Sequence, residues 1–214
     1  MSELNKRILT SVIISTLLIV SFFSYFLLTF VLLLILYLLF YEFFHIFNKI
    51  FTNNKIKLYL ILSCNLIFVT TITLYVWVIF TSNNLSNKIF LLLVFTITVS
   101  SDVGGYFFGK LFKGKKLTKI SPNKTYSGLF GAYLLSLISS YSIFNSFYNI
   151  HFIIFSSLII SSISQSGDIF ISFLKRKANF KNTGSILPGH GGLLDRLDGV
   201  IFSLPVSYIL INLL

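Results

Sequence analysis

Charged residues are scarce in this sequence, and acidic residues are scarcer still. Only 11% of the 214 residues are charged and only six are Asp or Glu, whereas 55% are hydrophobic. The mean hydropathy is +0.88, and several apolar runs exceed the ~18 residues that suggest a transmembrane helix. We therefore predict an all-α, polytopic transmembrane protein.

Cysteine is also nearly absent. A single residue, Cys64, lies inside an apolar run, so no disulfide can form within the chain, and a buried thiol without redox chemistry is expected. The N-terminal stretch "MSELNKRILTSVIIS" starts with positive charge but lacks a small-residue cleavage site, which indicates a retained first helix.

Apolar runs broken by polar clusters predict about seven spans. If the N-terminus is cytoplasmic, 16 of the 17 Lys and Arg residues fall in cytoplasmic segments and only Lys88 falls outside, as the positive-inside rule requires. The predicted spans are residues 8–23, 25–48, 58–80, 89–109, 128–146, 150–174 and 194–214.

The net charge of +11 raises the question of nucleic-acid binding. In an integral membrane protein, however, basic loops more often set topology and bind phosphate-bearing head groups. We therefore expect membrane lipids as partners and no nucleic acid.

Most of the acidic residues fall within or at the ends of predicted spans, where an ionised carboxylate is costly unless it is paired or bound to a cation. Four of them converge on the cytoplasmic half of the spans, namely Asp102, Asp168, Asp195 and Asp198. Two interpretations remain open: a shared cation site, or ion pairs that orient helices, such as Asp168 with Lys175. Glu42 is either a structural partner or part of a head-group cavity.

Two polar loops flank these acids. Residues 109–128 carry six lysines and the compact "SPNKT", and residues 175–192 carry four glycines. The lysines act in part as a topology anchor, while glycines before a helix N-terminus let backbone N–H groups turn toward an anion. Carboxylates beside such loops are what a Mg²⁺-dependent nucleotide site needs.

Two blocks of sequence resemble one known family. "SFLKRKANFKNTGSILPGHGGLLDRLDG" (172–199) and "SDVGGYFFGKLFKGKKLTKISPNKTYSG" (101–128) are similar to the signatures of phosphatidate cytidylyltransferases, also called CDP-diacylglycerol synthases. The blocks depart from the family pattern at a few positions: Asn182 stands where Asp is usual, Gly199 where Ser is common, and Tyr126 and Ser127 where Trp and Glu are common.

The resemblance implies the reaction of CTP with phosphatidate to give CDP-diacylglycerol and pyrophosphate. It implies Mg²⁺ as cofactor, with a second cation left open, held by Asp168, Asp195, Asp198 and Asp102. The expected catalytic residues are Asp168, Asp195, Asp198, Lys175, Arg176 and Arg196. The expected substrate-binding residues are Ser121, Lys124, Thr125, Lys181, Gly189, His190, Gly191 and Gly192. For His190, a role in loop structure has equal weight with phosphate binding or proton transfer.

The apolar runs, the distribution of basic residues and the resemblance together predict an organisation and a place in the cell. We expect residues 1–100 to form N-terminal transmembrane helices, and residues 101–214 to form a catalytic transmembrane region with cytoplasmic loops 110–127 and 175–193. We expect the active site to face the cytoplasm from a bacterial inner membrane, and we leave open a homodimer. The alternatives are a CTP-dependent lipid kinase of the dolichol kinase type, a transporter and an inactive scaffold.

Overall fold

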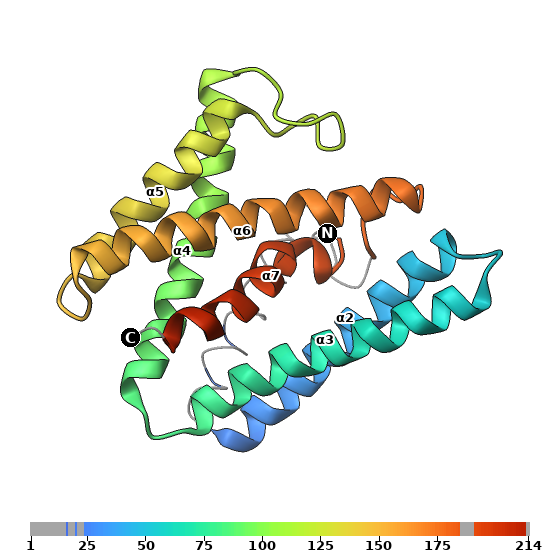
Figure 1. Ribbon diagram of the computed structural model, residues 1–214, viewed down its shortest axis with the longest axis horizontal. Helices are drawn as coiled ribbons and strands as arrows, with labels where there is room; N and C mark the ends of the chain where they lie inside the picture. The colour runs from blue at the N-terminus through green and yellow to red at the C-terminus, as the bar shows by residue number, and fades with distance from the viewer. Residues whose placement is uncertain (1–15, 17–19, 21–23, 185–190, 213–214) are drawn as a thin grey trace. The chain divides into compact units, whose positions relative to one another are not determined.

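The structure is a computed structural model that describes residues 16, 20, 24–184 and 191–212. Its long helices follow one another along the chain (Figure 1), and the described residues contain no strand but only isolated bridge residues, such as the paired Lys116 and Thr125. The predicted all-α class is confirmed. The helices from Tyr25 onward are α2 (Tyr25–Ile50), α3 (Lys55–Thr81), α4 (Leu85–Phe112), α5 (Tyr126–Phe144), α6 (Ile150–Lys177) and α7 (Leu194–Ile211).

Five of these helices, α2 to α6, are long and apolar enough to cross a membrane. Each one coincides within a few residues with a predicted span. Helix α7 matches the last predicted span, but it is not among the five, and the charged residues Asp195, Arg196 and Asp198 lie in its first turns. Almost all of predicted span 8–23 lies outside the described residues, so the total of seven spans and the orientation of the N-terminus stay predictions.

The chain divides into two compact units. The first contains α2, α3 and residues 174–197, which comprise the last turn of α6, the following segment and the first turn of α7. Helix α2 begins after Ser24, whose side chain accepts a hydrogen bond from the Leu27 N–H, and α3 begins after Asn54, which accepts from the Lys57 N–H at 3.0 Å. Both caps satisfy N–H groups that have no partner within their own helix.

The expectation of a buried Cys64 is wrong, because its side chain is exposed on α3. An apolar run that crosses a membrane has lipid-facing as well as core-facing positions, and both are apolar. Hydrophobicity alone therefore could not show which way Cys64 points.

The second unit contains α4, α5, α6 up to Phe173 and α7 from Asp198 onward. Its core joins all four helices through fully or almost fully buried side chains: Phe90, Leu93, Val94, Ile97, Phe144, Ile153, Ile160 and Leu210. Serine pairs also connect these helices, with Ser101 and Ser161 in hydrogen-bond contact at 2.9 Å. Such hydroxyl pairs satisfy polar groups in apolar surroundings.

Glycines let α4 and α5 approach each other closely. A Cβ atom at Gly104 would overlap the backbone carbonyl of Gly131, and one at Gly128 would lie 2.7 Å from the Gly105 carbonyl oxygen. Because these contacts involve rigid backbone, the spacing of the two helices requires glycine there. The close packing also brings the two ends of the connecting segment, residues 113–125, near each other.

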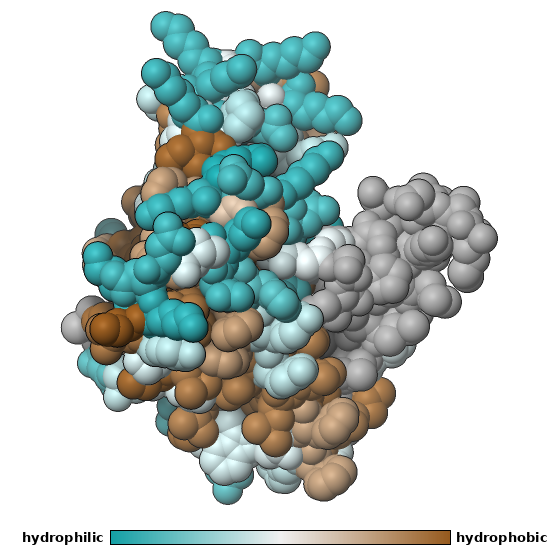
Figure 2. Space-filling model, turned by 90° about the vertical axis from the view of Figure 1, so that its right-hand side faces the viewer, coloured by the Kyte–Doolittle hydropathy of each residue, from teal (hydrophilic) through white to brown (hydrophobic). Residues whose placement is uncertain are grey.

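This connecting segment is strongly hydrophilic. Figure 2 shows long hydrophilic side chains gathered at the top of one face, at the height where Figure 1 draws the segment between α4 and α5. Its lysines at 113, 115, 116 and 119 are all exposed. The helices thus end in a basic polar loop that bends back toward α6.

Candidate active site

The loop between α4 and α5 is held in a hairpin-like turn. The Lys124 N–H donates to the Ser121 carbonyl at 3.0 Å, which closes a turn with Pro122 at its second position, a common site for proline. The Leu117 N–H donates to the Lys124 carbonyl at 2.7 Å. The Thr118 hydroxyl accepts from the Ser121 N–H at 3.1 Å. The compact "SPNKT" therefore positions Lys124.

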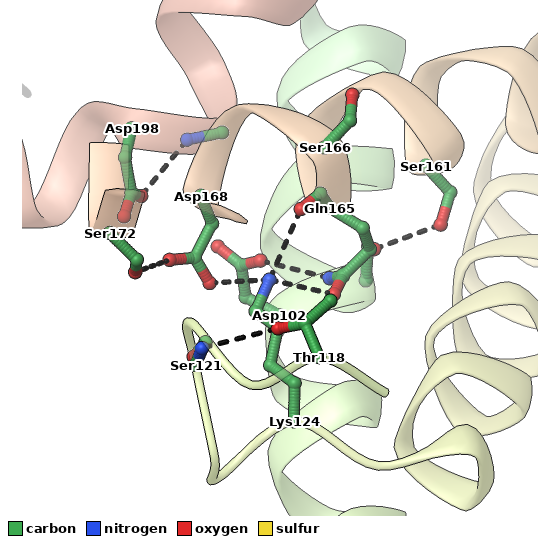
Figure 3. A network of polar contacts seen from close by, with 12 residues as sticks. Asp102, Thr118, Ser121, Lys124, Ser161, Gln165, Ser166, Asp168, Ser172 and Asp198 are labelled. Atoms are coloured by element: carbon green, nitrogen blue, oxygen red, sulfur yellow. Dashed lines mark hydrogen bonds and ion pairs between the residues drawn. The ribbon is translucent and has the colours of Figure 1, made fainter. Parts of the chain in front are cut away.

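The Lys124 side chain reaches across to α6. Its Nζ atom lies 2.6 Å from Asp168 Oδ2 and donates to both the backbone carbonyl and the side-chain Oε1 of Gln165, each at 3.2 Å (Figure 3). Only 15% of the Lys124 side chain is exposed. A half-buried ion pair with additional hydrogen bonds is better defined in geometry than a surface pair.

Gln165 connects this ion pair to α4. Its Nε2 atom donates to Ser101 Oγ at 3.1 Å and to Asp102 Oδ1 at 3.4 Å. The sequence interpretation missed Gln165, which the structure buries, although an amide side chain three residues before Asp168 in a predicted span was an available signal. Asp102 and Asp168 are thus held in one polar network through Gln165 and Lys124.

Two further residues complete the network around Asp168. The Ser172 hydroxyl donates to Asp168 Oδ1 at 3.4 Å, as expected for residues four apart on a helix. The Asp198 side chain lies beside that of Asp168 (Figure 3), and the negative charges of Asp168 and Asp102 both act on it. Asp198 Oδ1 accepts from the Gly199 N–H at 2.9 Å. Lys124 thus acts on Asp168 and Asp102, while Asp198 interacts with Asp168 itself.

A pocket of about 240 Å³ opens beside this network. Predicted binding residues Ser121, Lys124 and Thr125 all line it, as do Asp102 and Asp168. The remaining lining residues are Gly105, Tyr106, Leu117, Asn123, Gly128, Leu129 and Gln165. An ammonium group, carboxylates and hydroxyls around a pocket of this size suit a phosphate group with a cation.

The carboxylates alone do not form a closed metal cage. Within the described ranges, no three His, Cys, Asp or Glu side chains are gathered so that they could hold a metal ion by themselves. Mg²⁺ is commonly bound by one or two carboxylates, with phosphate oxygens and water completing its coordination. The donor set therefore fits a metal that binds together with a phosphate-bearing substrate.

In the first unit, described residues from both ends of the glycine-rich segment before α7 contact Asp195. Asp195 Oδ1 accepts from Lys175 Nζ at 2.6 Å. Asp195 Oδ2 accepts from the Thr183 N–H at 2.9 Å, the Thr183 hydroxyl at 3.1 Å and the Gly192 N–H at 3.3 Å. The predicted site residues Lys175, Asp195 and Gly192 are therefore in contact, and Lys175 pairs with Asp195 and not with Asp168, the partner that the helix-orienting interpretation named.

Glu42 of α2 takes part in the same network and is only 1% exposed. Its carboxylate accepts from the Thr183 hydroxyl at 2.7 Å, the Leu193 N–H at 2.8 Å and the Leu194 N–H at 2.9 Å. Of the two roles open for Glu42, the structure favours that of a structural partner. Thr183 was not identified from the sequence, since no local pattern marks a threonine that contacts a distant helix.

Other predicted residues lie nearby or outside the described residues. Arg176, Lys181 and Arg196 are exposed, and Asn182 is exposed and lies against Gly191. Gly191 has a φ of +85°, a conformation that favours glycine. Gly189 and His190 lie outside the described residues.

The predicted site residues are distributed over both units. Lys175, Arg176, Lys181, Gly191, Gly192, Asp195 and Arg196 belong to the first, and Asp102, Ser121, Lys124, Thr125, Asp168 and Asp198 belong to the second. Each unit holds its own polar network. A single site that contains both networks stays a prediction.

Comparison with known proteins gives the chain's family. The model of the "Cytidylyltransferase family" matches residues 68–214. Curated relatives named phosphatidate cytidylyltransferase include those of Rickettsia typhi, 44% identical over 140 residues, and Helicobacter pylori, 44% identical over 108 residues. The matched stretches cover 61% of this chain and 61% of the first relative, and 50% and 41% for the second.

A third relative of the same name, from Staphylococcus epidermidis, is 39% identical over 127 residues, which are 57% of this chain and 48% of the relative. The chain thus spans less than two thirds of the length of the curated relatives it matches. The family match covers α4 to α7 in full, and with them both polar loops and all the predicted site residues. Its apolar helices and its relatives make the chain an integral membrane protein, and it belongs to the cytidylyltransferase family.

Proposed function

We propose that this protein transfers the cytidylyl group of CTP to phosphatidate, producing CDP-diacylglycerol and pyrophosphate. The observation that carries the proposal is the pocket in which Lys124 faces Asp168, with Asp102 and Asp198 close by. The names of the curated relatives support the same reaction. Family membership alone would not select the lipid acceptor.

The reaction needs positioning more than covalent help. A phosphate oxygen of phosphatidate attacks the α-phosphorus of CTP, a new P–O bond forms, and the bond from the α-phosphorus to the oxygen bridging to the β-phosphorus breaks. The electron pair leaves with pyrophosphate. Lys124 supplies a positive charge at the pocket wall, where it stabilises charge on phosphate oxygens.

Binding of a phosphate group has a direct consequence for Lys124. Its ammonium group has three donors, which now serve Asp168 Oδ2 and two oxygens of Gln165. A phosphate that enters the pocket competes for these donors. Gln165 can keep Lys124 in place while Asp168 becomes available to a cation.

The carboxylates suit Mg²⁺, which we propose as cofactor. Asp168 and Asp198 would hold it, with Asp102 as a further ligand or hydrogen-bond partner. When bound, the ion neutralises charge on the phosphate oxygens of CTP. In the other network, Lys175, Arg176, Lys181 and Arg196 supply positive charge for the remaining phosphates, and Asp195 is a further proposed ligand.

The protein's place in the cell follows from charge. We propose that the protein lies in a bacterial inner membrane and that the loops around Lys116 and Lys181 face the cytoplasm. The cytoplasm is the compartment that contains CTP. The support is the 16 of 17 basic residues that the seven-span arrangement puts on one side. We propose membrane lipids and no nucleic acid as partners, and a homodimer remains open.

A labelling experiment with purified protein in phosphatidate vesicles tests the reaction. CTP labelled at the α-phosphorus should put label into lipid, whereas CTP labelled at the γ-phosphorus should put it into pyrophosphate. Label passing from the γ-phosphorus into lipid would identify a lipid kinase and overturn the proposal. Ion-coupled transport without CTP consumption would identify a transporter, and absence of both activities a scaffold.

A further inference from the structure

Among the described residues, no side chain from the segment just before α7 caps its N-terminus. The described residues directly before the helix read "GGL", without the Ser, Thr, Asp or Asn that usually accepts the first free N–H groups of a helix. The Leu193 and Leu194 N–H groups instead donate to the two oxygens of Glu42, which lies on α2. A residue from a distant helix thus caps α7.

Glu42 has no cationic partner in the part of the chain that the structure describes. The residue is 1% exposed, and its carboxylate accepts hydrogen bonds from two backbone N–H groups and one hydroxyl. An ionised carboxylate is favourable at the positive end of a helix. The fit is also tight, because a Cβ atom at Gly192 would overlap the Thr183 hydroxyl and lie 2.5 Å from Glu42 Oε2.

Thr183 transmits the position of Glu42 to Asp195. Its hydroxyl lies 2.7 Å from Glu42 Oε2 and 3.1 Å from Asp195 Oδ2, and its backbone N–H donates to Asp195 Oδ2 at 2.9 Å. The hydroxyl has a single proton, which it donates to one carboxylate at a time. The hydroxyl is therefore shared between the two carboxylates, with the shorter distance to Glu42 Oε2.

We propose that Glu42 is a positioning residue for the reaction, acting through Thr183 and the α7 N-terminus to orient Asp195 and its partner Lys175. This role rests on the proposed function. Glu42 lies in α2, outside the residues 68–214 that the family model matches. The matched segment is therefore completed by a carboxylate from an upstream helix, and all the groups involved belong to the first unit.

The kinetic test uses a pair of substitutions at Thr183. Thr183→Val removes the shared hydroxyl and keeps the side-chain shape, whereas Thr183→Ser keeps the hydroxyl. We expect Thr183→Val to lower kcat at least ~10-fold with KM for CTP within ~2-fold, and Thr183→Ser to stay within ~3-fold of wild type, because small misplacements of a reacting geometry are costly.

Thr73→Val is the matched control. Thr73 is buried in α3 of the same unit, and its hydroxyl donates only within its own helix, to the Val69 and Thr70 carbonyls. This variant should retain the wild-type kcat. An equal loss of kcat in Thr73→Val and Thr183→Val, or in Thr183→Ser and Thr183→Val, would overturn the positioning role.

Hydrogen exchange tests the contact without using activity. Glu42→Gln keeps the size of the side chain but replaces one acceptor oxygen by a donor, so amide exchange in residues 191–197 should rise while residues 126–144 exchange as in wild type. Unchanged exchange in 191–197 would overturn the positioning contact alone. A wild-type protein without cytidylyl transfer would overturn the proposed function, and with it the role of Glu42 in that reaction.

Discussion

Lys124 and Asp168 form an ion pair of 2.6 Å between the α4–α5 loop and α6. Gln165 supports the lysine from the same helix as the aspartate. The pair brings the "SPNKT" motif of the block 101–128 to an acidic residue that lies four residues before the block 172–199. The contact is a half-buried charge pair.

Lys124→Gln should reduce kcat/KM by at least ~10²-fold, because removal of one charged contact to the transition state commonly costs about 3 kcal/mol or more. Lys119→Gln is the matched control, since Lys119 is an exposed lysine of the same loop. Steady-state cytidylyl transfer is the measurement. Equal rates in the two variants would assign Lys124 a structural or topological role.

Asp168→Asn and Asp195→Asn should each lower turnover by at least ~10²-fold at saturating Mg²⁺. The sequence has four aspartates and all of them are predicted site residues, so no aspartate can serve as a matched control. Thermal unfolding of each variant shows instead whether the variant is folded. Folding should survive, because a neutral amide is cheaper to bury than a carboxylate. Near-native rates in both variants would make these carboxylates structural.

Asn182→Asp should change the rate by less than about tenfold, or ~1.4 kcal/mol. Asn182 is exposed beside Gly191, and the proposed ligands lie on helices, which hold their geometry better than loops do. The measurement is pyrophosphate release that depends on CTP and phosphatidate. A wild-type chain without activity, restored by this one substitution, would show that the missing carboxylate is indispensable.

Gly104→Ala should destabilise the protein by about 1–3 kcal/mol, the usual cost of overpacking. Its new Cβ would overlap the carbonyl of Gly131 on α5. Gly105→Ala is the matched control on the next residue, where the nearest atom to a Cβ is an ordinary 3.7 Å away. Denaturation in detergent should rank the variants, and equal stability would contradict the close approach of α4 and α5.

Cysteines introduced by Lys116→Cys and Lys181→Cys should react only with reagents that reach the cytoplasmic side. The background should carry Cys64→Ser, because Cys64 is the only native cysteine and is exposed. Labelling in sealed vesicles of known orientation is the measurement. Reaction from the periplasmic side at either position would overturn the proposed topology.

The helices could be predicted from the sequence because apolar runs, broken by short polar clusters, have the length that a membrane requires. Some of the residues that line the pocket could be predicted as well, since Ser121, Lys124 and Thr125 lie in one compact local motif. Both the helices and this motif can be recognised from residues that are close together in the sequence.

The hydrogen-bond and ion-pair partners of the charged side chains could not be predicted in the same way. One of the two interpretations left open paired Lys175 with Asp168, because the two share a helix face, yet Lys175 donates to Asp195 and Asp168 pairs with Lys124. The role of Glu42 as a cap for α7 depends on α2 packing beside a segment about 150 residues away, which no spacing rule reveals. The sequence alone determined where the helices and the charged groups lie along the chain, because hydrophobic length and local turn chemistry are local properties. Only the tertiary structure decided which donor satisfies each buried carboxylate, because a buried charge takes whichever partner the packing of distant segments brings within hydrogen-bond distance.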